Sequence, residues 1–284
     1  MKQSPVAKLD NEAIEAWISD NLGDLSTLDY YRWDDERFPD LPVKDLFNFF
    51  LIGAALSFCF IDADGKSLCS PTGKSKGSDT LWEVLRSHKD RFNNGKYPDK
   101  DFDEALLEGL AFLPLAEKRN RAVAEIRSFL QLFEGSAQIF IQRCSGDAVS
   151  IERSLSGVRT FNDVCYGIAF NKKARLFIAM VNGRLTPLRS IERIGGLADY
   201  QVPKILIHER MINLPDYILA DVRNGNPLAS GSDQEFQIRW ATVEAIQYIS
   251  DRVPELCPMK LDFFLWRKAR ALTNRSHICF TEFY

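Results

Sequence analysis

One carboxylate lies just before a predicted helix, in residues 198–204 (Ala-Asp-Tyr-Gln-Val-Pro-Lys). Proline lacks an amide N–H and clashes with the carbonyl four residues back, so Pro203 is tolerated only in the first helical turn. The spacing therefore predicts a helix that begins near Tyr200, with Asp199 at its amino terminus or one residue before it. There the helix dipole favours an ionised carboxylate by about 0.3–1 kcal/mol. Two interpretations remain open: a structural N-cap, which aspartate forms well, or a carboxylate that takes part in a reaction.

Other motifs that could carry chemistry are incomplete. The loop at 65–79 contains Gly73-Lys74-Ser75, part of a phosphate-binding loop, but Leu68 occupies the position of the first glycine. We interpret this segment as a solvated loop. The six cysteines stand singly, without a CxxC pair, and the three histidines are far apart in the sequence. We therefore expect reduced thiols, no metal site and no cofactor.

The apolar periodicity of the chain is mostly helical. Residues 137–141 fit either a helix or a strand, and strand signals elsewhere are few. We predict a mainly α-helical fold with little β structure. The prediction is a single domain of residues 1–284, in which residues 1–40 form an N-terminal helical extension. Helices are expected at 11–21, 47–60, 102–112, 115–133, 168–181, 187–193, 203–211, 233–253 and 259–272.

Composition narrows the possible partners. The chain of 284 residues has a net charge of -3, whereas a platform for nucleic-acid polymers is usually basic. Residues 1–5 lead into acidic sequence without an apolar signal core, and the apolar run at 47–60 is too short to span a bilayer. We therefore predict a cytoplasmic protein that binds neither a membrane nor a nucleic-acid polymer.

The segment before Asp199 resembles a known element. Thr186-Pro187 is typical of a helix start, and Gly195-Gly196 is expected to end that helix. This helix–Gly-Gly–helix context resembles the helix-hairpin-helix element of DNA glycosylases, in which a carboxylate follows the hairpin and faces the anomeric carbon of a sugar. The resemblance implies a fold like that of these enzymes and a catalytic role for Asp199.

Six blocks, in order, resemble the queuosine salvage protein family, the queuosine 5′-phosphate N-glycosylases. Together they cover roughly residues 40–284. The blocks are Leu56-Ser57-Phe58-Cys59-Phe60; Leu113-Pro114-Leu115 with Glu117, Arg119 and Glu125, followed by Phe133-Glu134-Gly135-Ser136; Phe170-Asn171-Lys172-Lys173-Ala174; residues 198–204; Gly231-Ser232 with Glu235, Ile238 and Arg239; and residues 261–266 (Leu-Asp-Phe-Phe-Leu-Trp).

The chain departs from the family pattern at several positions. Ser57 stands where asparagine is usual, Ile61 where tryptophan is usual, and Gln201 where arginine is usual. Arg37-Phe38-Pro39 falls in the stretch where the family is expected to have a histidine. These departures affect base recognition more than the type of reaction.

The resemblance implies an enzyme that hydrolyses the N-glycosidic bond of queuosine 5′-phosphate and releases queuine for salvage into tRNA modification. Glycosidic cleavage passes through an oxocarbenium-like transition state, which a carboxylate near the anomeric carbon stabilises or captures. Asp199 is the candidate for this role. Queuine is a 7-deazaguanine and cannot be protonated at position seven, so hydrogen bonds elsewhere on the base must activate it.

Base recognition is implied for a second set of residues. Asp262 is the candidate acceptor for N–H groups of the base, and Trp266, one helical turn further on the same face, could stack on the ring. The alternative is a buried aromatic helix with one polar residue bonded to the backbone. Ala198, Tyr200 and Phe58 are the remaining candidates for the base pocket, although Phe58 fits a core position better.

The phosphate of such a nucleotide requires cations. Glu235 and Arg239 are four residues apart, which fits a helix-surface ion pair or a role in orienting side chains near the pocket. His277 fits a structural histidine better than a catalytic one. The phosphate-binding candidates are Lys172, Lys173 and Lys204, with Arg175 behind them.

Two other functions remain as alternatives. A pocket of aromatic residues with one aspartate would also suit a non-catalytic protein that binds queuine or a nucleotide. A DNA glycosylase would share the hairpin and the carboxylate, but it must flip a base from a duplex and hold a polyanion. The net charge of -3 counts against the DNA glycosylase.

Overall fold

The computed structural model describes residues 6–284, so Met1 to Pro5, which the signal-sequence prediction includes, lie outside the described residues. The described chain is mainly helical: twelve α-helices and three two-stranded pairings account for its regular structure. This confirms the predicted mainly α fold with little β structure. The described chain groups into two compact units. The first is made of residues 6–30, 164–172 and 192–280, and the second of residues 31–163, 173–191 and 281–284. The single-domain prediction stays a prediction.

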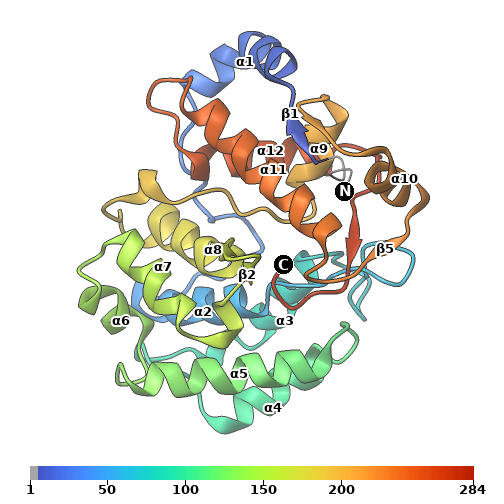
Figure 1. The fold of residues 1–284 in the computed structure, drawn as a ribbon. Helices are drawn as coiled ribbons and strands as arrows, with labels where there is room; N and C mark the ends of the chain where they lie inside the picture. The colour runs from blue at the N-terminus through green and yellow to red at the C-terminus, as the bar shows by residue number, and fades with distance from the viewer. Residues whose placement is uncertain (1–5) are drawn as a thin grey trace. The chain divides into compact units, whose positions relative to one another are not determined.

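The first unit is built around α9, α11 and α12, which pack against one another (Figure 1). Their core includes Val202, Ile246 and Leu265, and α1 adds Trp17 and Ile18 to it. The elements are β1 (Lys8–Leu9), α1 (Asn11–Ser26), β2 (Val164–Cys165), β3 (Ile168–Ala169), α9 (Val202–His208), β4 (Ile212–Asn213), α10 (Asp216–Asn224), β5 (Pro227–Leu228), α11 (Asp233–Ser250), α12 (Pro258–Arg270) and β6 (Ile278–Cys279).

The short strands of this unit join distant parts of the chain. β1 pairs antiparallel with β4, and β5 pairs parallel with β6, while β2 and β3 form a local hairpin. The β1–β4 pairing and the packing of α1 hold residues 8–26 against the first unit, with the four buried side chains of α1 in its core. Of the expected helical extension at 1–40, only Asn11–Ser26 is helical within the described residues.

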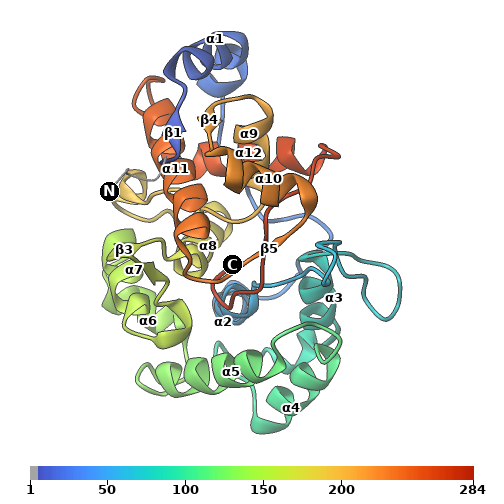
Figure 2. The same ribbon diagram turned by 45° about the vertical axis from the view of Figure 1, so that its right-hand side comes forward.

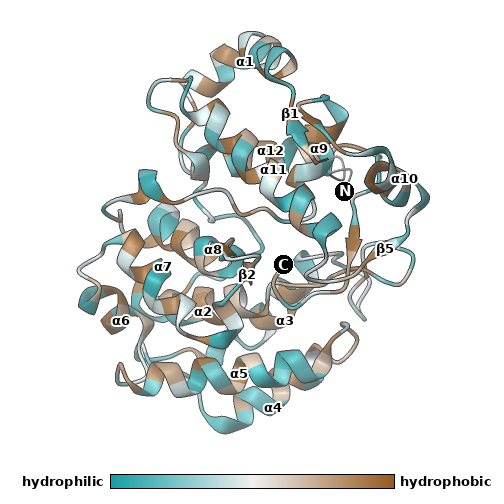
Figure 3. Cartoon of the chain, in the orientation of Figure 1, coloured by the Kyte–Doolittle hydropathy of each residue, from teal (hydrophilic) through white to brown (hydrophobic). Residues whose placement is uncertain are grey.

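The second unit surrounds α2 (Figure 2). Twelve of the residues of α2 are buried, as expected for a helix that is apolar on all sides. By contrast, α5 presents a polar outer face, visible as alternating hydrophilic and hydrophobic segments (Figure 3). The elements are α2 (Val43–Leu56), α3 (Asp79–Ser87), η1 (Lys89–Arg91), α4 (Lys100–Gly109), α5 (Ala116–Gln131), α6 (Ala137–Arg143), α7 (Ala148–Ser156), η2 (Arg159–Phe161), α8 (Lys172–Met180, of which Lys172 belongs to the first unit) and η3 (Val181–Leu185).

Arg119 ties α5 to the end of α2. Its guanidinium donates to the carbonyls of Leu56 (2.7 Å), Phe58 (2.6 Å) and Cys59 (3.2 Å) and lies 4.2 Å from the centre of the Phe58 ring. Burial lowers the pKa of Arg119 to about 10, so the group stays charged at neutral pH. Cys59 has a φ of 50°, a left-handed conformation, and its carbonyl is among those that Arg119 binds. The arginine thus satisfies carbonyls that the end of α2 leaves without helical partners.

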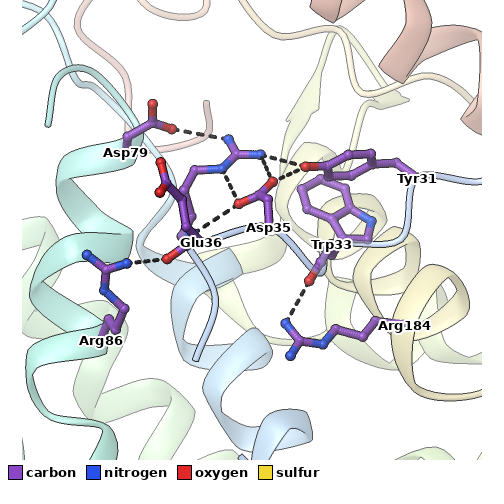
Figure 4. Close-up of polar contacts among 8 residues, drawn as sticks. Tyr31, Trp33, Asp35, Glu36, Asp79, Arg86 and Arg184 are labelled. Carbon is purple, nitrogen blue, oxygen red and sulfur yellow. Dashed lines mark hydrogen bonds and ion pairs between the residues drawn. The ribbon is translucent and has the colours of Figure 1, made fainter. Parts of the chain in front are cut away.

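A second arginine network holds the irregular segment from Tyr31 to Pro39 (Figure 4). Arg184 donates to the carbonyls of Trp33 (2.7 Å) and Pro39 (3.0 Å). Arg37, in the stretch where a histidine was expected, donates to Asp35 through Nε (2.8 Å) and pairs with Asp79 (3.2 Å). Partial burial alone would raise the pKa of Asp35, but hydrogen bonds from Arg37 and Tyr31 outweigh it and lower that pKa to about 2.

Most predicted helices are confirmed, with ends that move by a few residues. The solvated loop at 65–79 is confirmed up to Asp79, which starts α3, and residues 137–141 belong to a helix rather than a strand. Two predictions are wrong. The segment at 168–181 begins as strand β3 and becomes helical only at Lys172, after Asn171 adopts a left-handed φ of 51°. The helix expected at 187–193 is a single 3-10 turn at Ile191–Arg193, because Ser190 adopts a left-handed φ of 56°, which a right-handed helix cannot include.

We expect Arg119→Met to lower the free energy of unfolding by about 3 kcal/mol, because three buried carbonyls lose a charged donor. Urea titration followed by circular dichroism measures the effect. The exposed Arg32 provides a matched control, and Arg32→Met should change stability by less than about 0.5 kcal/mol. Equal stability of the two variants would show that Arg119 does not hold α2 and α5 together.

Candidate active site

Asp199 lies in the loop before α9, in the first unit. The helix starts at Val202 with Pro203 as its second residue. Asp199 therefore lies three residues before the first helical residue, rather than at the amino terminus or one residue before it as predicted. One carboxylate oxygen of Asp199, Oδ1, accepts the amide N–H groups of Gln201 (2.7 Å) and Val202 (3.1 Å). The carboxylate therefore accepts amide groups at the amino end of α9, but Gln201 occupies the N-cap position, so the interpretation of Asp199 as the N-cap residue itself is wrong.

Burial raises the pKa of Asp199 above its ordinary value of 3.8. The charge of Lys172, the two amide hydrogen bonds and the charge of Lys204 act in the opposite direction, but burial is the larger effect. From the sequence, the helix dipole was expected to favour the ionised form of Asp199. The amide donors at the start of α9 do favour it, but the removal of water from the carboxylate has the larger effect on its pKa. The result is a carboxylate in a dry site with two cations near it.

The residue before Asp199 is strained. Ala198 is buried and has a φ of 50°, a conformation that costs a residue with a Cβ about 1–2 kcal/mol. Its carbonyl accepts a hydrogen bond from Arg239 Nε at 3.3 Å. The Arg239 guanidinium also lies 4.1 Å from the centre of the Phe170 ring. Strained residues held by their surroundings concentrate at functional sites, so this conformation supports a functional role for the segment.

The motif that contains Arg239 forms the start of α11. Ser232 caps the helix by accepting the amide of Glu235 at 3.3 Å, and the Glu235 carboxylate accepts the amide of Gly231. Glu235 and Arg239 are four residues apart with 4.0 Å between carboxylate and guanidinium, but only 3% and 2% of their side chains are exposed. The surface ion pair considered from the sequence is wrong: the pair is buried. Sequence spacing revealed the pair but not its contact with Ala198.

Asp262 anchors the loop that leads to Asp199. Its Oδ2 accepts the amide of Leu197 at 2.8 Å, and the carboxylate is buried. Gly196 is required here, because a Cβ at this position would lie 2.5 Å from Ile246 Cδ1 and 3.2 Å from Asp262 Oδ2. The backbone contact considered for Asp262 is therefore present, and base binding by this residue stays a prediction.

Trp266 is half-buried at the edge of the same core. Its ring stacks on Phe263, with centroids 5.3 Å apart and an angle of 24°, and the Arg270 guanidinium lies 4.8 Å from its centre. Tyr200 is also half-buried. The stacking of a base on Trp266 stays a prediction.

The three candidate lysines fall into two groups. Lys172 and Lys204 lie in the first unit, both are buried, and both act electrostatically on Asp199. Burial lowers the pKa of Lys204, against the attraction of Asp199, and its ammonium donates to the carbonyl of Leu272 at 3.3 Å. Lys173 and Phe58 belong to the second unit, where the Lys173 ammonium donates to the carbonyl of Glu282 (2.8 Å) and lies 4.8 Å from the Phe58 ring centre.

His277 is a buried group near Arg239 whose position the sequence did not predict. Burial and then the charge of Arg239 lower its pKa to about 3, so the imidazole is neutral. Within residues 6–284, no three side chains of His, Cys, Asp or Glu come together as a metal site would need. In the same residues, no helix combines the length and apolar character needed to cross a bilayer.

We expect Gly196→Ala to lower the free energy of unfolding by about 1–3 kcal/mol, since the new methyl group overlaps Ile246. Gly23 in α1 has no heavy atom within 4 Å of the place that an added methyl group would take, so Gly23→Ala is the matched control and should be neutral or slightly stabilising. Thermal unfolding of both variants tests this. A Gly196→Ala protein as stable as the control would contradict the close packing of the loop.

Four curated relatives match this chain, each bearing the name queuosine 5′-phosphate N-glycosylase/hydrolase. The protein of mouse is 27% identical over 180 residues, which cover 56% of this chain and 53% of the mouse protein. The protein of Dictyostelium discoideum is 25% identical over 61% of this chain and 59% of its own length, so the match spans little more than half of these two relatives. The protein of Sphaerobacter thermophilus is 23% identical over 85% of this chain and 79% of its own length.

The family model described as queuosine salvage protein matches residues 41–283. This range contains Asp199, the strained Ala198, the buried Glu235–Arg239 pair and Asp262. The match covers far more than half of the 284 residues. The chain therefore belongs to the queuosine salvage protein family.

Proposed function

We propose that this protein hydrolyses the N-glycosidic bond of queuosine 5′-phosphate and releases queuine, which then becomes available for tRNA modification. The observation that carries this proposal is the buried Asp199 carboxylate, which lies beside a strained residue and within the electrostatic reach of Lys172 and Lys204. The names of the four relatives support the substrate.

In the proposed mechanism, Asp199 acts on the sugar. The anomeric carbon develops positive charge as the bond to the base lengthens, and a carboxylate at low dielectric stabilises that charge strongly. Asp199 Oδ1 is held by two amide N–H groups, so the carboxylate keeps its orientation through the reaction. Oδ2 would face the anomeric carbon as a nucleophile or as an electrostatic stabiliser.

The leaving base requires hydrogen bonds, because a 7-deazaguanine has carbon in place of the basic ring nitrogen. We assign recognition of the base to Asp262 and Trp266, with Ala198, Tyr200 and Phe58 as further pocket residues. A carboxylate has more than one acceptor position, so Asp262 can hold the Leu197 amide and also accept an N–H group of the base.

We assign the 5′-phosphate to the cations Lys172, Lys173 and Lys204. We also propose that the two units act as a single domain and that the protein works in the cytoplasm without a nucleic-acid polymer as a partner. A queuine-binding protein without turnover is the competing function. It differs in one measurable result, since queuine would stabilise the protein against heat while no base is released from the nucleotide.

We expect Asp199→Asn to lower kcat for queuine release by at least about 100-fold while the protein remains folded, because a neutral amide cannot stabilise the cationic sugar. Chromatography of the products from queuosine 5′-phosphate, the free nucleoside and guanosine monophosphate measures the activity. Asp20, exposed on α1, provides the control Asp20→Asn, which should keep full activity. Full activity of Asp199→Asn would remove Asp199 from the mechanism.

The activity should be lost at low pH with a midpoint above 3.8. Burial raises the pKa of Asp199, so its carboxylate takes up a proton at a higher pH than an exposed aspartate does, and the activity that needs the ionised form is lost at that higher pH. Lys172→Gln removes a positive charge that favours the carboxylate, so its midpoint should lie at higher pH than that of the wild type. The measurement is the pH profile of kcat/KM, with Lys8→Gln at an exposed position as control. A midpoint that moves to lower pH in Lys172→Gln would contradict the electrostatic coupling.

A further inference from the structure

A cavity of about 640 Å³ lies within the first unit. Its walls come from one face of α9, from β4, from α10 and from the segment at 274–275. Lys204, Ile207 and His208 line it from α9, at the spacing that places residues on one helical face. Asp199, Asp262 and Trp266 do not line this cavity, so it is not the base pocket proposed above.

The lining of the cavity is strongly basic. It contains four basic side chains, Lys204, Arg210, Arg223 and Arg275, besides His208. Asp216 is the one carboxylate among the lining residues. The chain as a whole has a net charge of -3, so this concentration of positive charge is local. A concave wall with one sign of charge attracts a counter-ion of the opposite sign.

Within the described residues, the guanidinium groups of Arg210, Arg223 and Arg275 make no side-chain hydrogen bond or ion pair with the protein. Solvated surface arginines often have no partner, so exposure alone would mean little. Here three such groups share one cavity. Arg275 is also packed against the left-handed Gly225, where an added Cβ would overlap its Nη1. The carboxyl end of α10 attracts nearby cations such as Arg223, and the carboxyl end of α9 does the same for Arg210, which lies two residues after it.

Lys204 connects the cavity to the candidate catalytic carboxylate. It lines the cavity, and its charge lowers the pKa of Asp199 against the effect of burial. Burial in turn lowers the pKa of Lys204 itself. An anion in the cavity would favour the charged form of Lys204 and would also place negative charge near Asp199.

From these contacts we infer that the cavity is a binding site for a phosphate-class oxyanion, with Arg210, Arg223 and Arg275 as its principal donors. Guanidinium groups bind phosphate through two parallel hydrogen bonds, and several of them around one cavity suit a doubly charged ion. The oxyanion has two possible sources. One is the 5′-phosphate of the nucleotide that reacts at Asp199, which would then contact these arginines and Lys204 in place of Lys172 and Lys173. The other is a separate phosphate. Only the first source rests on the function proposed above.

The test is a calorimetric titration of the full chain with inorganic phosphate at low and at physiological ionic strength. We expect saturable binding in the wild type and at least about 10-fold weaker binding in the double variant Arg210→Gln/Arg223→Gln. Arg153→Gln, at an exposed position of α7 in the second unit, is the control and should bind as the wild type does. Thermal unfolding first confirms that each variant is folded. Absent binding, or equal binding by the wild type and the double variant, would overturn the inference.

Kinetics then separate the two sources. If the site holds the phosphate of the substrate, the double variant should raise KM for the nucleotide by at least about 10-fold and leave KM for the nucleoside unchanged, and inorganic phosphate should compete with the nucleotide. If the site holds a separate phosphate, inorganic phosphate should not compete, and it should move the acid midpoint of activity towards higher pH in the wild type alone. A protein that releases no base would refute the proposed function but leave the calorimetric result standing, so the two failures are distinguishable.

Discussion

The structure around the candidate site depends on how a carboxylate is kept charged in a largely buried position. Asp199 loses hydration, which raises its pKa, and recovers part of that loss from two amide groups at the start of α9. The positive charges of Lys172 and Lys204 compensate a further part of it. A carboxylate held in this way is oriented before the reaction and can stabilise a cation that forms next to it.

The backbone just before Asp199 is held by two buried charged residues, Asp262 and Arg239. Asp262 accepts the amide of Leu197 before it, and Arg239 donates to the carbonyl of Ala198. Arg239 is in turn paired with Glu235 at the first turns of α11. Removing one member of such a network would leave a buried charge without compensation, which is why these contacts favour one loop conformation, including the left-handed Ala198.

The second unit uses arginine in a different way. Arg119 has three backbone carbonyls as partners where α2 ends, and Arg184 binds two carbonyls of the segment at 31–39. Both arginines hold chain that lacks regular secondary structure. This contact links two of the family blocks. The block at 56–60 supplies the carbonyls, and the block at 113–119 supplies the guanidinium that binds them.

The sequence by itself determined most helices, the position of Asp199 ahead of Pro203, and the family. These depend on local periodicity, on the missing amide of proline and on the order of residue blocks. It could not determine that 187–193 is a 3-10 turn, that Glu235 and Arg239 are buried, or that Arg210, Arg223 and Arg275 share a cavity. Only the tertiary structure decides these features, because burial and the meeting of distant charges depend on which elements pack together. The direction of the pKa shift of Asp199 also depends on tertiary structure, because desolvation by segments distant in sequence outweighs the effect of the local helix amino terminus.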